Sequence, residues 1–280
     1  MGIFMAWLML ASSLTALATH RLIALFLLVC TIITAALTQL IDWQAILLLI
    51  CITIIAIIRL RFQHYLSIKI ISEITLLTCT IGLFIHLFPG FNNLRYLDKV
   101  TVGEHSAPFT MYFNFDKALV PFILLACLPT LFVCRPAKHA TKVQWALLVV
   151  SVPLLLLIAT AAGGLAFEWH FPSWLPAFVL CNLFFVSLAE EALFRGYFQQ
   201  RLTLWFKSPY LALVIASLLF GAVHFAGGPL LILFATLAGL IYGLAWMWSG
   251  KLWLAVSIHF GLNLGHLLFF TYPVKMVMSQ

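Results

Sequence analysis

Ionisable residues inside long apolar segments are the first feature of this sequence that points to chemistry. An ionisable side chain deep in a membrane helix costs at least about 2.5 kcal/mol by insertion scales, so each one requires a partner or a function. Carboxylate and imidazole groups in such places are the usual participants in acid–base chemistry. Three groups follow one another in the last third of the chain, namely Glu190-Glu191 with Arg195, then His224, and then His259 with Asn263.

The first group places two adjacent carboxylates beside one cation. Glu191 and Arg195 are four residues apart, so they share one helix face in the favourable order for an ion pair. Glu190 points about 100° away around the same helix, which leaves its carboxylate available to a group on another helix. We therefore expect Glu191 and Arg195 to support the helix and Glu190 to take part in the chemistry.

The three groups reach similar depths in the membrane. Counted at about 1.5 Å per residue from the predicted cytoplasmic ends, Glu190 lies about 16 Å deep, His224 about 22 Å and His259 about 12 Å. Asn263 follows His259 by four residues on the same helix face, at a depth of about 18 Å. The alternative to a reactive site is a structural network of hydrogen bonds that ties the helices together.

The elements that must position these groups are membrane-spanning helices. The chain of 280 residues is 64% hydrophobic and only 8% charged, whereas about a quarter of the residues in a soluble domain are charged. A helix needs about 20 apolar residues to cross the hydrocarbon core, so we predict an all-α, polytopic transmembrane helix bundle of about ten spans, with about eight as the lower bound. The segments are 3–18, 22–41, 45–58, 70–88, 118–133, 143–162, 174–200, 209–225, 230–248 and 252–271.

The net charge of +7 comes from short basic gaps between apolar segments rather than from a basic surface, so we expect no nucleic-acid partner. Alternate gaps fall on one side of the membrane, and that side carries most of the lysines and arginines. By the positive-inside rule this side is cytoplasmic and both termini lie outside. A cleaved signal peptide at 1–18 is the alternative, although that segment lacks a basic start. A chain of 31.4 kDa without targeting tails favours a bacterial protein of the cytoplasmic (inner) membrane.

One hydrophilic segment, 89–117, divides the chain into two parts. The first part, 1–117, contains four spans and this loop, and the second, 118–280, contains six spans and the polar groups. We expect an extracytoplasmic loop that rests on the bilayer surface, with a substrate lid as the alternative. Glu73 follows Lys69 by one helical turn, so we expect the two to form a structural ion pair. The six cysteines lack the spacing of metal ligands, so we expect them to be structural as well.

Written as patterns, the polar groups are EExxxR (Glu190, Glu191, Arg195), FxxxH (Phe220, His224) and HxxxN (His259, Asn263). On successive C-terminal spans and in this order, they resemble the CPBP family, also called the Abi family. That family contains CAAX prenyl proteases and bacteriocin-processing enzymes, which are intramembrane endopeptidases. The resemblance covers about 174–271, and no signature position departs from the pattern.

The resemblance implies that Glu190 and His224 activate a water molecule while His259 and Asn263 form an oxyanion hole. Peptide hydrolysis requires a base for water and donors for the developing oxyanion, and these side chains supply both. The glycines and proline at 227–229, just beyond His224, are expected to break the helix and leave room for substrate. The implied partner is a membrane-embedded or lipid-anchored peptide or protein.

Other functions stay open from the residues alone. Glu190, His224 and His259 also form a plausible zinc ligand set, although the chain has no HExxH motif and Asn263 fits a hydrogen-bond donor better than a ligand. We expect no required cofactor, with zinc as the possible exception. Two rival functions are a non-catalytic immunity or scaffold protein of the same family and a proton-coupled carrier, which would predict an internal repeat that the sequence lacks.

Overall fold

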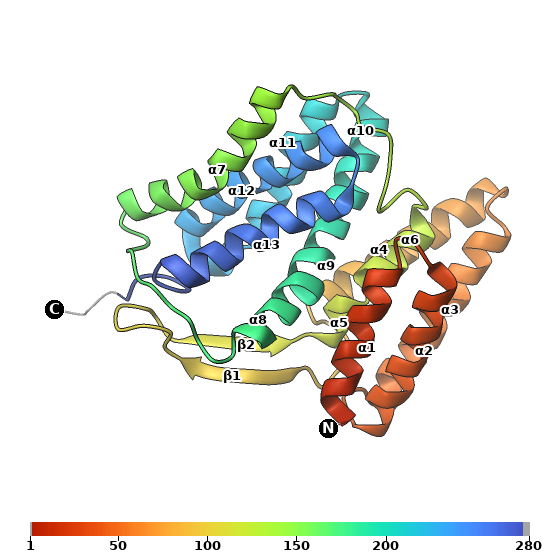
Figure 1. Ribbon diagram of the computed structural model, residues 1–280. Helices are drawn as coiled ribbons and strands as arrows, with labels where there is room; N and C mark the ends of the chain where they lie inside the picture. The colour runs from red at the N-terminus through yellow and green to blue at the C-terminus, as the bar shows by residue number, and fades with distance from the viewer. Residues whose placement is uncertain (1, 277–280) are drawn as a thin grey trace. The chain divides into compact units, whose positions relative to one another are not determined.

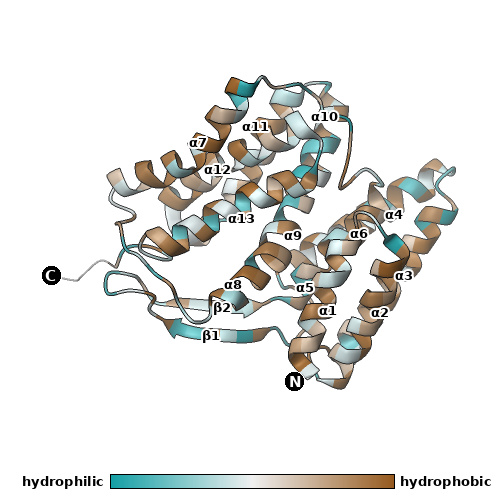
Figure 2. Cartoon of the chain, in the orientation of Figure 1, coloured by the Kyte–Doolittle hydropathy of each residue, from teal (hydrophilic) through white to brown (hydrophobic). Residues whose placement is uncertain are grey.

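Helices make up most of the chain in the computed structural model, which describes residues 2–276 (Figure 1). Met1 and residues 277–280, the outer ends of the two predicted parts, lie outside the described residues. Six helical runs in the described chain are long and apolar enough to cross a membrane: α3 (Trp43–Arg61), α4 (Leu66–Phe84), α7 (Lys142–Ala161), the run Leu175–Phe206, the run Phe225–Ser249 containing α12 (Gly228–Ser249), and α13 (Leu252–Phe269). The shorter apolar helices are α1 (Gly2–Ala16), α2 (Arg21–Leu37) and α11 (Pro209–Ala222). The predicted polytopic helical bundle is confirmed, and hydrophobic residues make up most of these helices (Figure 2).

The predicted span 118–133 is not one helix. The chain there forms α5 (Phe115–Ala118) and α6 (Val120–Cys127), and Leu128 is extended. Two prolines explain the interruption, because Pro121 is accepted only in the first turn of a helix and Pro129 forces the residue before it out of the helical region. The prediction of a full span at this position is therefore wrong.

The described chain divides into two compact units that do not follow the order of the sequence. Unit 1 consists of Met1–Leu94, Tyr112–Phe132 and Phe184–Leu193, and unit 2 consists of Arg95–Met111, Val133–Leu183 and Phe194–Gln280. The units are defined by packing, whereas the predicted parts 1–117 and 118–280 are consecutive along the chain, so that division stays a prediction.

Unit 1 is built from two helix pairs, α1 with α2 and α3 with α4. Trp7 is fully buried, and its ring meets the rings of Phe113, Phe115 and Phe185 at centroid distances of 5.3, 5.7 and 5.2 Å. Edge-to-face and tilted contacts of this kind add to the stability that apolar burial supplies.

A buried arginine ties the second helix pair of unit 1 together. Arg59 at the end of α3 makes an ion pair with Glu73 on α4, with 2.8 Å between Nη2 and Oε2. It also donates to the carbonyls of Lys69, Ala126 and Cys127. Because these acceptors satisfy the guanidinium, the charge is tolerated in an apolar region. Lys69, the expected partner of Glu73, contributes its backbone carbonyl to Arg59, and its own pairing with Glu73 stays a prediction.

Unit 2 contains α7, α11, α12 and α13 together with the two ends of the run Leu175–Phe206, and α11 and α12 form a closely packed pair. A 3-10 turn, Phe225–Gly227, lies between them, and Gly228, the first residue of α12, adopts a positive φ of 83°. The predicted helix break near His224 is confirmed, and it begins at Val223. Gly221 on α11 faces Thr236 and the backbone of α12 so closely that a larger side chain would clash. Small residues allow membrane helices to approach in this way.

The run Leu175–Phe206 is irregular on both sides of the two adjacent glutamates. It begins with α8 (Leu175–Leu180) and ends with α10 (Gln200–Phe206). Two π-helical segments, Cys181–Ser187 and Ala192–Gln199, flank the short α9 (Leu188–Glu191). Segments of π-helix are rare and are found frequently at functional sites.

The hydrophilic segment 89–117 is ordered. It contains a two-stranded sheet of β1 (Leu94–Val100) and β2 (Phe109–Phe113), which the sequence analysis did not predict. The segment then leads directly into α5.

Candidate active site

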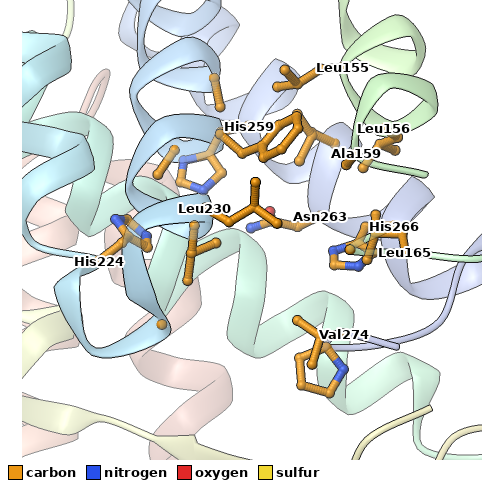
Figure 3. A pocket seen from close by; sticks show the side chains of 18 of the residues that line it. Leu155, Leu156, Ala159, Leu165, His224, Leu230, His259, Asn263, His266 and Val274 are labelled. Atoms are coloured by element: carbon orange, nitrogen blue, oxygen red, sulfur yellow. The ribbon is translucent and has the colours of Figure 1, made fainter. Parts of the chain in front are cut away.

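A pocket of about 220 Å³ lies inside unit 2 and carries three of the predicted site residues. His224, His259 and Asn263 line it, together with His266 (Figure 3). Its other walls come mostly from aliphatic side chains of α7, α12 and the chain around them, including Leu155, Leu156, Leu165, Leu230 and Leu231. The pocket therefore combines an apolar wall with several nitrogen-bearing side chains.

His224 lies in the turn between α11 and α12, two residues after α11 ends at Ala222. Its Nδ1 is 2.8 Å from the carbonyl oxygen of Phe220. A carbonyl only accepts, so Nδ1 must carry the proton. In the neutral ring this leaves the lone pair on Nε2, which is the arrangement that a base requires.

Aromatic rings hold His259 in place on α13. The imidazole is 4% exposed and stacks on the ring of Tyr242, with centroids 4.6 Å apart and an angle of 12° between the planes. The edge of Phe220 meets the same imidazole at 5.7 Å and 89°. Phe220 also contacts the ring of His224 at 4.9 Å. The ring of Phe220 thus touches the imidazoles of both His224 and His259 and restricts their orientation.

Asn263 lies one helical turn after His259, and both side chains line the pocket, as their spacing predicts. Its Nδ2 donates to Oδ1 of Asn182 at 3.2 Å. Asn182 is another amide side chain within an apolar segment of the sequence. In the structure it orients the amide of Asn263.

Arg195 supports the aromatic wall rather than the pocket itself. The guanidinium is fully buried and lies 4.3 Å from the centroid of Phe220 and 5.3 Å from that of Tyr242. Its Nη2 donates to the carbonyl of Gly239 at 3.1 Å. Cation–π contacts of a desolvated arginine are worth about 2 kcal/mol or more, so Arg195 strengthens the two rings that hold His259. The pairing of Glu191 with Arg195 stays a prediction.

Glu190 belongs to unit 1, where Lys117 on α5 is its ion-pair partner. The ammonium nitrogen is 2.7 Å from Oε1, and the two side chains are only 12% and 8% exposed. We expected this carboxylate to meet a group on another helix, and the structure supplies a cation that the sequence analysis had assigned to the loop. No signal in the sequence connects the two residues, because 73 positions separate them.

The sequence analysis also missed a polar cluster in unit 2, which we call the polar knot and define as Ser106, Glu168 and His170. Oε2 of Glu168 accepts from Ser106 Oγ at 2.6 Å and from His170 Nε2 at 3.0 Å. Oε1 accepts from the amide of His105, and Nδ1 of His170 donates to the carbonyl of Leu267. Burial alone would raise the pKa of Glu168, but these hydrogen bonds to the ionised form outweigh burial and lower it.

Two other histidines make local contacts. Nδ1 of His86 is 2.8 Å from Oδ2 of the buried Asp116. Nε2 of His266 donates to the carbonyl of Thr271, so this pocket residue also secures the end of α13. Among residues 2–276, no group of three His, Cys, Asp or Glu side chains could hold a metal ion as placed. Whether the chain requires zinc stays a question for experiment.

Comparisons with known proteins agree with the motifs. Residues 172–265 match the family model described as Rce1-like, type II CAAX prenyl endopeptidase. The resemblance to the CPBP family is confirmed for this region. All of the motif residues from Glu190 to Asn263 fall inside this CPBP-type region.

A curated relative is also found. The uncharacterized protein YpbD of Bacillus subtilis (strain 168) is 35% identical over 77 residues, which are 27% of this chain and 36% of that protein. The similarity therefore spans about a third of the relative's length. No solved structure matches the chain.

Proposed function

We propose that this chain is an intramembrane endopeptidase that cleaves a membrane-embedded or lipid-anchored peptide with a water activated by Glu190 and His224. The observation that carries the proposal is that His224, His259 and Asn263, which come from two motifs far apart in the sequence, line one pocket in the CPBP-type region. The matched family of CAAX prenyl endopeptidases supports proteolysis as the reaction.

The base in this proposal is shared between a carboxylate and an imidazole. His224 presents the lone pair of Nε2, because its Nδ1 is committed to the carbonyl of Phe220. The carboxylate in this proposal is Glu190 of the EExxxR motif, and the match of residues 172–265 to the CAAX prenyl endopeptidase model supports its role beside His224.

The oxyanion would be bound by His259 and Asn263. An amide nitrogen carries two protons, and the bond to Asn182 uses one of them, so Nδ2 of Asn263 retains a donor. Donors that are already oriented stabilise a developing oxyanion more than mobile ones, because no reorganisation is needed during the reaction. The rigid support of His259 by Tyr242 and Phe220 and of Asn263 by Asn182 meets this condition.

The apolar wall of the pocket favours a lipid-like or hydrophobic substrate, which agrees with the membrane-bound class of substrate. We place the chain in the cytoplasmic membrane of a bacterium, with the basic gaps on the cytoplasmic side. Reporter fusions at Lys138 and Lys207 should then read cytoplasmic and a fusion at Glu104 should read extracytoplasmic. Equal labelling of the three positions would contradict this orientation.

The experiment that tests the reaction compares the membrane proteomes of cells that express the wild-type chain, Glu190→Gln and His224→Gln. Peptides produced by the wild type should be absent with both variants, while each variant remains inserted and folded. Glu104→Gln, a change at an exposed loop position, is the matched control and should behave as the wild type. If no peptide depends on Glu190 or His224, the chain is not a protease of this kind, and the scaffold or carrier function gains support.

The requirement for metal is tested separately. We expect the purified protein to stay active after exhaustive chelation and to contain much less than one zinc per chain, because the amide of Asn263 fits a hydrogen-bond donor better than a metal ligand. In the zinc alternative, Glu190, His224 and His259 would hold the ion, and it would lower the pKa of a bound water. Loss of one equivalent of zinc on substitution of His224 or His259 would establish that alternative.

A further inference from the structure

The ion pair between Lys117 and Glu190 is buried within unit 1. The two charged atoms are 2.7 Å apart, and only about a tenth of either side chain is exposed. The ammonium also lies 4.5 Å from the centroid of the Phe84 ring on α4. Lys117 therefore has a charged partner on one side and an aromatic face on another, and both restrict the position of its nitrogen.

The position of Lys117 in the chain is also restricted. The residue lies on α5, a single turn between β2 and α6, and the neighbouring Phe115 and Ala118 are fully buried. The adjacent Asp116 is 1% exposed and accepts from His86, Asn93 and the amide of Lys117. The backbone from which the lysine extends is thus held by packing and by hydrogen bonds. A backbone held in this way fixes the position of the lysine ammonium more closely than a surface loop would.

From this geometry we infer that Lys117 is a positioning residue for Glu190 in the proposed peptide hydrolysis. Hydrogen bonding to Oε1 sets the rotation of the carboxylate, and the positive charge offsets the cost of burying an anion. A base that is misplaced by about 1 Å loses about a hundredfold in rate, so a fixed carboxylate matters to the reaction. This inference rests on the proposed role of Glu190.

The inference predicts different results for three substitutions in the full-length chain. Lys117→Met keeps the length of the side chain and removes its charge, and it should slow cleavage by about tenfold to a hundredfold per folded molecule. Lys117→Arg retains a cation and a donor and should recover most of the rate. Glu73→Gln is the matched control, because it removes another ion pair of unit 1, the one between Glu73 and Arg59. It should lower stability without slowing cleavage per folded molecule.

The measurement is a pulse–chase of the peptides that depend on the wild-type chain in the membrane comparison, normalised to folded protein by size-exclusion chromatography. Glu190→Gln is included in every experiment. If Glu190→Gln cleaves like the wild type, or no peptide depends on the chain, the proposed function fails and this inference fails with it. If Glu190→Gln is inactive but Lys117→Met cleaves as fast as the wild type or faster, the positioning role alone is overturned. The same conclusion follows if Lys117→Arg is as slow as Lys117→Met, or if Glu73→Gln slows cleavage equally.

Discussion

The pocket and the polar knot are two clusters of polar residues in the same unit, and they use histidine in opposite ways. In the knot, both ring nitrogens of His170 are engaged, one by the carboxylate of Glu168 and one by a backbone carbonyl. In the pocket, Nδ1 of His224 donates to a backbone carbonyl, and the ring of His259 stacks on Tyr242 and meets the edge of Phe220. Aromatic rings pack against the imidazoles of His224 and His259. The imidazole of His170, in contrast, links Glu168 to the backbone at Leu267 through its two hydrogen bonds.

Under the proposed function, this difference separates a structural polar cluster from a reactive one. The knot joins segments near Ser106, Glu168 and Leu267, and its donors and acceptors are bonded to one another or to the backbone. The pocket presents nitrogen-bearing side chains to a volume of about 220 Å³. Exchanging a residue should therefore affect stability in the knot and rate in the pocket.

The largest expected effect comes from replacing one histidine in each cluster. His224→Gln should lower cleavage by about 10²–10⁴-fold, because it removes a general base, while the thermal unfolding midpoint changes little. His170→Gln should lower the free energy of unfolding by about 1–3 kcal/mol, because it leaves a buried carboxylate with one donor fewer, and cleavage per folded molecule should persist. Cleavage assays and thermal unfolding of both variants check the pair. If His170→Gln is the inactive variant or His224→Gln is the unstable one, the assignment of a structural role to the knot and a reactive role to the pocket is contradicted.

A slightly smaller effect is expected for Asn263. Removing an oxyanion donor typically costs about 10²–10³-fold in turnover, so Asn263→Ala should reduce turnover while the substrate affinity changes little. Asn263→Asp preserves the shape of the side chain but replaces the donor by an acceptor, and it should be as slow as the alanine variant. Steady-state kinetics on a peptide identified in the membrane comparison would measure both. A change confined to affinity would assign Asn263 to substrate binding instead.

The smallest effect concerns the pH dependence of the knot. The pKa of Glu168 is lowered in the folded chain, so the stability that it contributes is present above its unfolded pKa of about 4.3 and is lost as the pH falls through the folded value. Glu168→Gln should lower the free energy of unfolding at pH 7 by about 1–2 kcal/mol and should remove this part of the acid sensitivity. Thermal unfolding of the wild type and the variant between pH 7 and pH 3 tests the sign. A variant that loses stability with acid as steeply as the wild type would show that Glu168 is not responsible.

Much of the helical architecture was predictable from local sequence. Apolar segments of about 20 residues placed most of the helices within a few residues of their observed ends, because a membrane requires that length. The four-residue spacing of His259 and Asn263 correctly predicted that they share a helix face. The span 118–133 was mispredicted because hydrophobicity alone does not register that Pro121 and Pro129 interrupt a helix.

The sequence by itself determined the membrane-helix class, the break near His224 and the order of the motifs, since each depends on residues that are neighbours in the chain. Tertiary structure alone decided that Lys117 meets Glu190, that Arg59 meets Glu73, and that Ser106, Glu168 and His170 form a knot. These contacts join residues as many as 73 positions apart, and no helical or strand period relates such positions. The local sequence indicates that a charge in an apolar segment requires a partner, but it does not identify that partner. The packing of the whole chain decides which residue lies close enough to pair with it.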